Sequence, residues 1–207
     1  MTQNKINEKM NLKDVIKVTL FGVIGFVISV VTGMAVSALG TFGTFVHTSL
    51  GAILTGPLVI VMCQKVHKKG SISLYYLISA IVYLVMGLWP MSIILILSAV
   101  ISGILLGNSN NYFDYKKIGI AYVIAELIYS LHGFIFILVM GVEGLVRQFP
   151  NMFTVEKAQW MKDFFLNPRN MAIILSIQII ASIIGVFFGK YIHKKFFAKN
   201  NNGTVLN

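Results

Sequence analysis

Long apolar runs, separated by short polar stretches, dominate the chain. The runs are about 20 residues each, long enough as helices to cross a hydrocarbon core roughly 30 Å thick. This pattern predicts an all-α membrane protein, a bundle of six transmembrane helices. The predicted spans cover residues 15–39, 44–63, 71–88, 91–106, 118–141 and 170–191.

The first run could also be read as a secretory signal peptide, because Val36-Ser37-Ala38 would pass as a cleavage site. The run is longer than the roughly 7–15 apolar residues of a signal core, so a transmembrane helix is favoured. Polar tails are expected at residues 1–14 and 196–207, on either side of a transmembrane domain over residues 15–195.

One connection is unusually long for so small a bundle. Residues 142–168 join the fifth and sixth spans, and Thr154 gives a helix-start signal for residues 154–165. Long loops in compact proteins are often lids or binding loops. Two interpretations remain open: a lid over a binding site, or a passive helix along the outer interface.

Composition narrows the class of protein. Hydrophobic residues make up 57% of the 207 residues and charged residues 12%, which excludes an ordinary soluble domain. The length leaves no room for a soluble catalytic domain beside the bundle. Cys63 is the single cysteine, which excludes an intramolecular disulfide and a cysteine-based metal cluster.

The positive charges predict the orientation in the membrane. The net charge is +10, and in the six-span arrangement thirteen of the seventeen Lys and Arg residues fall on one side. The positive-inside rule therefore predicts that both termini are cytoplasmic. The charge then reflects topology and contact with anionic lipid, not nucleic-acid binding. The thirteen are Lys5, Lys9, Lys13, Lys17, Lys65, Lys68, Lys69, Lys116, Lys117, Lys190, Lys194, Lys195 and Lys199.

Glu126 is the one acidic residue inside a predicted span. A carboxylate there costs about 2.5–3.5 kcal/mol on translocon scales, so it needs a partner. Tyr122, Tyr129 and Gly133 share its helical face, which therefore points into the bundle. Glu126 is either a ligand- or ion-facing acid, or a structural residue that is protonated or bonded to a Ser or Tyr of another helix.

Depth in the membrane suggests a substrate site. At 1.5 Å per residue, Glu126 lies about 12 Å and His132 about 21 Å above the inner end of the fifth span. An outward-facing pocket could gather His47, Trp89, Tyr129 and His132, with Glu126 at its floor. Alternatively, Trp89 belongs to an interfacial belt, and the histidines only hydrogen-bond the bundle. Gln178 in the sixth span is a further buried polar candidate with the same two interpretations.

A strip of small residues runs along the first span. Gly22, Gly25, Ser29 and Gly33 fall on one helical face, where small side chains let helices approach closely in lipid. The strip either packs within the bundle or docks a second membrane protein. In the second span, the pair Gly56-Pro57 is expected to kink or locally open the helix.

These features together resemble a known family. The first-span strip, Gly56-Pro57 and the run Lys65-x-x-Lys68-Lys69-Gly70 are similar to the Trep_Strep or MptD-like group of substrate-binding (S) components of energy-coupling factor (ECF) transporters. The stretches 103–106, 115–117 and 121–122 resemble that group's junction of spans four and five. The chain departs from the group at residues 107–111, which lack an expected acid. It also has Gly and Ser where many S components carry an Ala-x-x-x-Ala strip.

The resemblance implies a function. S components are six-helix proteins of the bacterial plasma membrane that bind a vitamin or similar micronutrient from outside the cell. They associate through the first span with a transmembrane coupling subunit driven by two cytoplasmic ATPases. This chain lacks a G-x-x-x-x-G-K-[ST] phosphate loop, so ATP hydrolysis would belong to those partners. No cofactor or metal is expected.

Other classes of membrane protein fit the sequence less well. An enzyme is not expected, because the spans contain no H-E-x-x-H, no G-x-S-x-G and no paired acids. A stand-alone proton-coupled secondary transporter, with Glu126 as its proton site, remains the alternative. The absence of inverted-repeat halves argues against it.

Overall fold

The computed structural model describes residues 8–198, and within that range it contains helices and no β-strand. Lys5, Lys199 and parts of both predicted tails lie outside the described residues. The α-helices are α1 (Leu12–Ser37), α2 (Gly40–Val46), α3 (Ser49–Val66), α4 (Ser71–Val85), α5 (Trp89–Leu106), α6 (Tyr115–Ser130), α7 (His132–Gln148), α8 (Val155–Phe165) and α9 (Pro168–Ile192). Two short helices, η1 (Ser109–Phe113) and η2 (His193–Phe197), complete the set.

Five helical stretches of the described chain are long and apolar enough to cross a membrane. They are α1, the stretch Gly40–Val66, α5, the stretch Tyr115–Gln148 and the stretch Pro168–Phe197. The remaining predicted span corresponds to α4, which is apolar but has 15 residues. At 1.5 Å per residue α4 is about 22 Å long, shorter than a typical hydrocarbon core.

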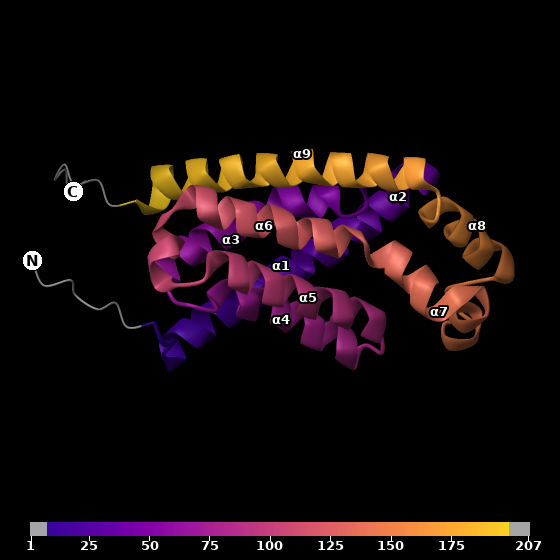
Figure 1. Ribbon diagram of the computed structural model, residues 1–207, viewed down its shortest axis with the longest axis horizontal. Coiled ribbons are helices and arrows are strands. Elements are labelled where there is room, and N and C mark those ends of the chain that lie inside the picture. Colours follow the sequence, from indigo (N-terminus) through magenta and orange to yellow (C-terminus); the bar gives the residue numbers. More distant parts are fainter. Residues whose placement is uncertain (1–7, 199–207) are drawn as a thin grey trace, which may run out of the picture.

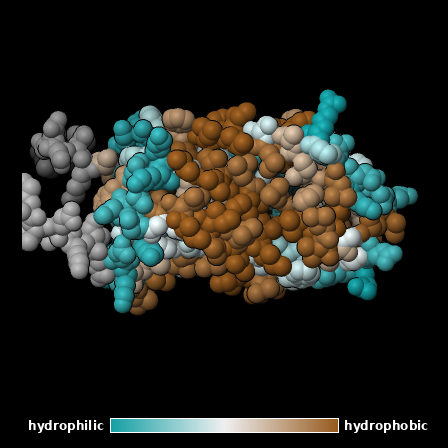
Figure 2. All heavy atoms as spheres, viewed as in Figure 1, coloured by the Kyte–Doolittle hydropathy of each residue, from teal (hydrophilic) through white to brown (hydrophobic). Residues whose placement is uncertain are grey.

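The long helices lie roughly along the longest axis of the molecule (Figure 1). The start of α1 and the end of α9 lie at one end, together with the connections α3–α4 and α5–α6. We call this the lysine-rich end, because it carries Lys13, Lys65, Lys116 and Lys190. The opposite end carries α2, α8 and the last turns of α7. Hydrophilic residues gather at both ends, and a broad apolar band separates them (Figure 2).

Glycines allow α3 and α9 to cross at close range. A Cβ atom on Gly56 would lie 2.5 Å from the carbonyl carbon of Gly185. Pro57 has no N–H, so the carbonyl of Ile53 lacks its usual helical partner, and this carbonyl faces Gly185. Helix α3 nevertheless runs without a break from Ser49 to Val66, so the local opening that was expected at Gly56-Pro57 is not seen.

The stretch Gly40–Val66 is interrupted instead at His47 and Thr48, between α2 and α3. The hydroxyl groups of Thr48 and Ser49 donate to Oε1 of Gln178 on α9, at 2.7 and 3.0 Å. These side-chain bonds hold the start of α3 against α9. The predicted second span, residues 44–63, is therefore two helices that meet at an anchored break.

A second interruption divides the predicted fifth span. Leu131 separates α6 from α7, and the hydroxyl of Ser130 donates to the carbonyl of Leu127 at 2.7 Å. Side chains that bond nearby backbone carbonyls compete with the regular helix. Helix α7 is kinked at Gly141, the predicted end of the fifth span, where the backbone is not helical (φ +62°, ψ −177°), and a further helical segment then runs to Gln148. The predicted connection over residues 142–168 thus begins with the last part of α7.

The helix expected at residues 154–165 is confirmed as α8. Thr154 is its N-cap, and Oγ1 of Thr154 accepts a hydrogen bond from the backbone N–H of Lys157 at 3.2 Å. The buried residues Phe164 and Phe165 attach α8 to the bundle. The Phe164 ring packs edge-to-face on Phe45 of α2 at 4.8 Å, and the Phe165 ring covers Gly133 of α7.

Candidate functional site

A cavity of about 580 Å³ lies at the end of the molecule opposite the lysine-rich end. It is lined mainly by α2, the α4–α5 turn, the α6–α7 break, the α7–α8 connection and α8, with single residues from the ends of α1 and α9. We call it the large cavity. Its lining residues are Ser37, Gly40, Thr41, Thr44, His47, Thr48, Tyr83, Leu88, Met91, Ser130, His132, Gly133, Phe136, Phe149, Met152, Phe153, Lys157, Trp160, Met161, Phe165 and Ile174.

The wall of the large cavity is mostly apolar and aromatic, and its charged side chains are basic. No Asp or Glu lines it among the described residues, whereas Lys157 and two histidines do. Nζ of Lys157 donates to the carbonyl of Met152 at 3.0 Å and lies 5.4 Å from the centre of the Phe153 ring. Such a wall suits an apolar or flat molecule with a neutral or anionic polar group.

Two helix breaks bring the two histidines together. His47 follows α2 and His132 begins α7, and their ring centres are 5.4 Å apart. Nδ1 of His132 lies 3.0 Å from the carbonyl oxygen of Tyr129. Because a carbonyl can only accept, Nδ1 carries the proton, and Nε2 of the neutral ring is an acceptor. Nδ1 of His47 is buried without a hydrogen-bond partner among the described residues.

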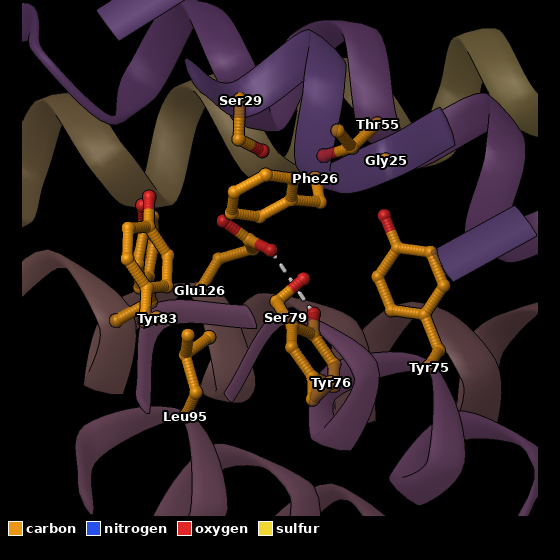
Figure 3. Close-up of a pocket in the computed structure, with 11 residues that line it drawn as sticks. Gly25, Phe26, Ser29, Thr55, Tyr75, Tyr76, Ser79, Tyr83, Leu95 and Glu126 are labelled. Atoms are coloured by element: carbon orange, nitrogen blue, oxygen red, sulfur yellow. Dashed lines mark hydrogen bonds between the residues drawn. The ribbon is translucent and has the colours of Figure 1, made fainter. Parts of the chain in front are cut away.

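Glu126 lies in a separate, much smaller chamber between α1, α3, α4, α5 and α6. About 20 Å³ of this chamber is open to the centre of a water molecule, enough for about one water. The hydroxyl of Tyr76 donates to Oε1 of Glu126 at 3.0 Å. Figure 3 shows the carboxylate between Phe26 of α1 and Tyr76 of α4, with the Tyr75 hydroxyl directed toward Gly25 and Thr55.

The structure therefore divides the predicted pocket in two. His47 and His132 line the large cavity, whereas Glu126 and Tyr129 line the small chamber. Tyr83 lines both and belongs to the wall between them. Its position could not be read from the sequence, because it depends on how far α4 extends before the turn at Gly87.

Two other predicted substrate residues line neither cavity. Trp89 is half-buried at the first turn of α5. Gln178 is fully buried and is occupied by the protein itself: Oε1 accepts from Thr48 and Ser49, and Nε2 donates to Ser182 at 3.3 Å. Gln178 supports the large cavity from behind, through Thr48.

The small-residue strip on α1 packs against the chain's own helices. Gly25 lies against the hydroxyl of Tyr75, and a Cβ on Gly22 would lie 3.0 Å from Cβ of Ile78 on α4. A Cβ on Gly33 would lie 3.2 Å from Nε2 of His47. Ser29 is half-buried and lines the small chamber. Internal packing, one of the two interpretations of the strip, is thus what the structure shows.

Several lining residues were not anticipated. Phe149 and Phe153 are spaced four residues apart in the long connection, a spacing that could have pointed to a shared apolar surface. Among the described residues there is no group of three or more His, Cys, Asp or Glu that could hold a metal ion.

Comparison with known proteins places the chain in a family. Residues 12–199 match the family model described as a hypothetical bacterial integral membrane protein (Trep_Strep). No curated protein and no solved structure matches the chain. The match extends over all the helices described above, from α1 to η2. The chain belongs to the Trep_Strep family of bacterial integral membrane proteins.

Proposed function

We propose that this protein is the substrate-binding component of an ECF-type importer, which captures a small micronutrient in the large cavity. The observation that carries the proposal is the cavity itself. Its volume of about 580 Å³ falls in the range of roughly 300–1,000 Å³ typical of small-molecule sites. It is apolar, with a few polar groups gathered at the two helix breaks.

The orientation follows from charge. If the lysine-rich end faces the cytoplasm, the large cavity lies at the outer side of the membrane, where an importer meets its substrate. In this arrangement the short helix α4 also crosses the membrane and brings the number of transmembrane helices to six. Helix α8 and the α7–α8 connection would then form an outer lid, because they supply much of the cavity wall.

The lining favours a neutral or anionic ligand over a cationic one. Lys157 and the histidine pair line the cavity, and its described wall has no carboxylate. The Nε2 acceptor of His132 can receive a hydrogen bond from an N–H or O–H of the ligand. Glu126, the one buried acid in the predicted spans, is enclosed in the other chamber and does not supply a counter-charge.

Energy for uptake would come from partners: a transmembrane coupling subunit and two cytoplasmic ATPases. Docking through Gly22, Gly25, Ser29 and Gly33 is not favoured, because this chain's own α3 and α4 cover that strip. The opposite face of α1 is free. Leu20, Val27 and Val31 are more than half exposed, and α1 has the smallest buried share, 22%, of the five candidate spans. We therefore place the coupling subunit on this face.

Ligand binding by the purified protein tests the proposal. A thermal-shift screen of neutral and anionic micronutrients should identify a stabilising compound, whose affinity is then measured by calorimetry. His132→Phe should weaken binding at least tenfold, because it removes the Nε2 acceptor from the wall. Trp89→Phe is the matched control, an aromatic change at the same end that touches neither cavity. Equal effects of the two changes, or no effect of His132→Phe, would contradict the assigned site.

The secondary transporter remains a second candidate because of one observation. Glu126 is buried beside a water-sized chamber, as a proton site would require, and no Lys or Arg of the described residues lines that chamber. Uptake in cells separates the two functions. A protonophore should abolish uptake by a proton-coupled carrier, whereas uptake through an ATP-driven importer should follow ATP depletion and require the coupling subunit.

A further inference from the structure

A second apolar hollow lies at the side of the bundle, between α6 and α9. It is a groove of about 460 Å³ near the lysine-rich end, and Figure 1 shows the two helices that form it running side by side. Gly119, Val123, Ile183 and Val186 form much of its wall. It is remote from the large cavity and shares no lining residue with it.

The groove faces the lipid. Phe187 and Ile183 on α9 line it and are 66% and 40% exposed, and Ile120 on α6 is 47% exposed. Gly119 lets α6 and α9 pack closely at the floor of the groove, because a Cβ there would lie 2.8 Å from Cγ1 of Val186. In a membrane, a groove of this kind between two apolar helices is in contact with acyl chains.

One end of the groove is positively charged. Lys116 on α6 and Lys190 on α9 line it, and Nζ of Lys190 lies 5.8 Å from the centre of the Tyr115 ring. Neither ammonium group is paired with a carboxylate in the part of the chain that the structure describes. The neighbouring acid, Asp114, accepts a hydrogen bond from the backbone N–H of Lys116 at 2.8 Å, as the N-cap of α6.

We propose that this groove binds one anionic phospholipid, with an acyl chain along Val123 and Ile183 and the phosphate between Lys116 and Lys190. Basic pockets between transmembrane helices on the cytoplasmic side are a known type of anionic headgroup site. The separation of charge and apolar wall favours a lipid over a partner helix: both lysines lie at one end, and the remainder of the wall is uncharged. The proposal does not depend on the function assigned to the large cavity.

Native mass spectrometry tests it directly. Protein taken into mild detergent from nanodiscs of equal parts phosphatidylglycerol and phosphatidylcholine should retain one bound phosphatidylglycerol. The double variant Lys116→Gln/Lys190→Gln should lose that adduct at least five-fold. The control Lys162→Gln/Arg169→Gln removes two cations at the opposite end and should retain it. Equal retention by both double variants would overturn the proposal.

Two further measurements identify the occupant. Val123→Trp narrows the groove but keeps both lysines, so it should also reduce the phosphatidylglycerol adduct. Retention at the original level would show surface attraction only and would overturn the groove assignment. Inorganic phosphate and glycerol phosphate should give no thermal stabilisation. If either soluble phosphate stabilises the protein as well as the lipid does, the site binds a soluble anion. If the groove variants instead change the oligomeric mass, a second chain occupies the groove. Either result would overturn the proposal. Should the double variant fail to fold, Lys116→Gln with rescue by Lys116→Arg replaces it.

Discussion

The hydroxyl of Tyr76 on α4 donates a hydrogen bond of 3.0 Å to Oε1 of Glu126 on α6. Both residues are buried, so this bond joins two helices inside the bundle. The adjoining chamber is too small for a micronutrient but large enough for about one water. Glu126 therefore has a partner within the protein, and the chamber that contains it is separate from the large cavity.

Substitutions of Glu126 should act on stability and not on ligand affinity. Glu126→Gln keeps an acceptor for Tyr76, so its effect on unfolding should be small. Glu126→Leu leaves the Tyr76 hydroxyl without an acceptor and should destabilise the protein by about 1–3 kcal/mol. Thermal unfolding and calorimetry measure the two properties. A tenfold loss of affinity in Glu126→Gln, with stability unchanged, would place the carboxylate in contact with the ligand.

The α3–α9 crossing should not tolerate even a methyl group. Gly56→Ala places a Cβ 2.5 Å from the backbone of Gly185, so the helices must separate. We expect a loss of about 1–3 kcal/mol in stability, typical of overpacking. Gly144→Ala is the control, because its Cβ would meet only the Met140 side chain, at 3.3 Å. There the better helix propensity of alanine should leave stability equal or higher. Equal losses in both variants would contradict the close crossing.

Gly25→Leu tests the internal packing of the α1 strip. The new side chain would collide with the Tyr75 hydroxyl, so the isolated protein should unfold at lower temperature. Leu20→Ala, on the exposed face of α1, should leave the isolated protein nearly unchanged. If a coupling subunit docks on that face as proposed, its co-purification should depend on Leu20 and not on Gly25. A normal melting temperature for Gly25→Leu, with assembly alone lost, would return the docking role to the strip.

Local sequence patterns predicted much of the fold but less of the candidate site. Apolar runs predict helices because each run must satisfy its own backbone in lipid, and Thr154 marks α8 by its own capping bond. The helix breaks at His47 and Leu131 could not be predicted in this way. The first is held by Gln178, a residue about 130 positions away in the chain. Without these breaks, depth alone placed Glu126 and His132 in one pocket.

The stability of the folded protein should fall as the pH is lowered, and His67, at the lysine-rich end, should contribute to this loss. Its ring stacks on Phe113 at 3.8 Å. Burial, and then the positive charge of His193, lower the pKa of His67 below its ordinary value of 6.5. The folded state thus binds fewer protons than the unfolded state as pH falls below that value, so its stability declines until the lower folded pKa is passed. His67→Asn, which accepts the left-handed backbone there (φ 45°), should reduce this acid sensitivity in unfolding measured from about pH 7.5 to 5. An unchanged pH profile would contradict it.

Gln178 should behave as the support of the large cavity and not as a ligand contact. Gln178→Leu removes the acceptor of the Thr48 and Ser49 hydroxyl groups at the start of α3. Both hydroxyls are buried, so stability should fall by about 1–3 kcal/mol. Ligand affinity should fall with it, because Thr48 lines the cavity.

Combining Gln178→Leu with a change of its partner Thr48 distinguishes a supporting role of Gln178 from direct contact with the ligand. Thr48→Val removes one of the two donors, and in the Gln178→Leu background it should cost less than it does alone, since the hydrogen bond is already absent. Gln159 is exposed on α8 and lines neither cavity, so Gln159→Leu is the control and should change neither property. If Gln178→Leu instead weakened binding at an unchanged melting temperature, and its effect simply added to that of Thr48→Val, the amide would have to touch the ligand itself.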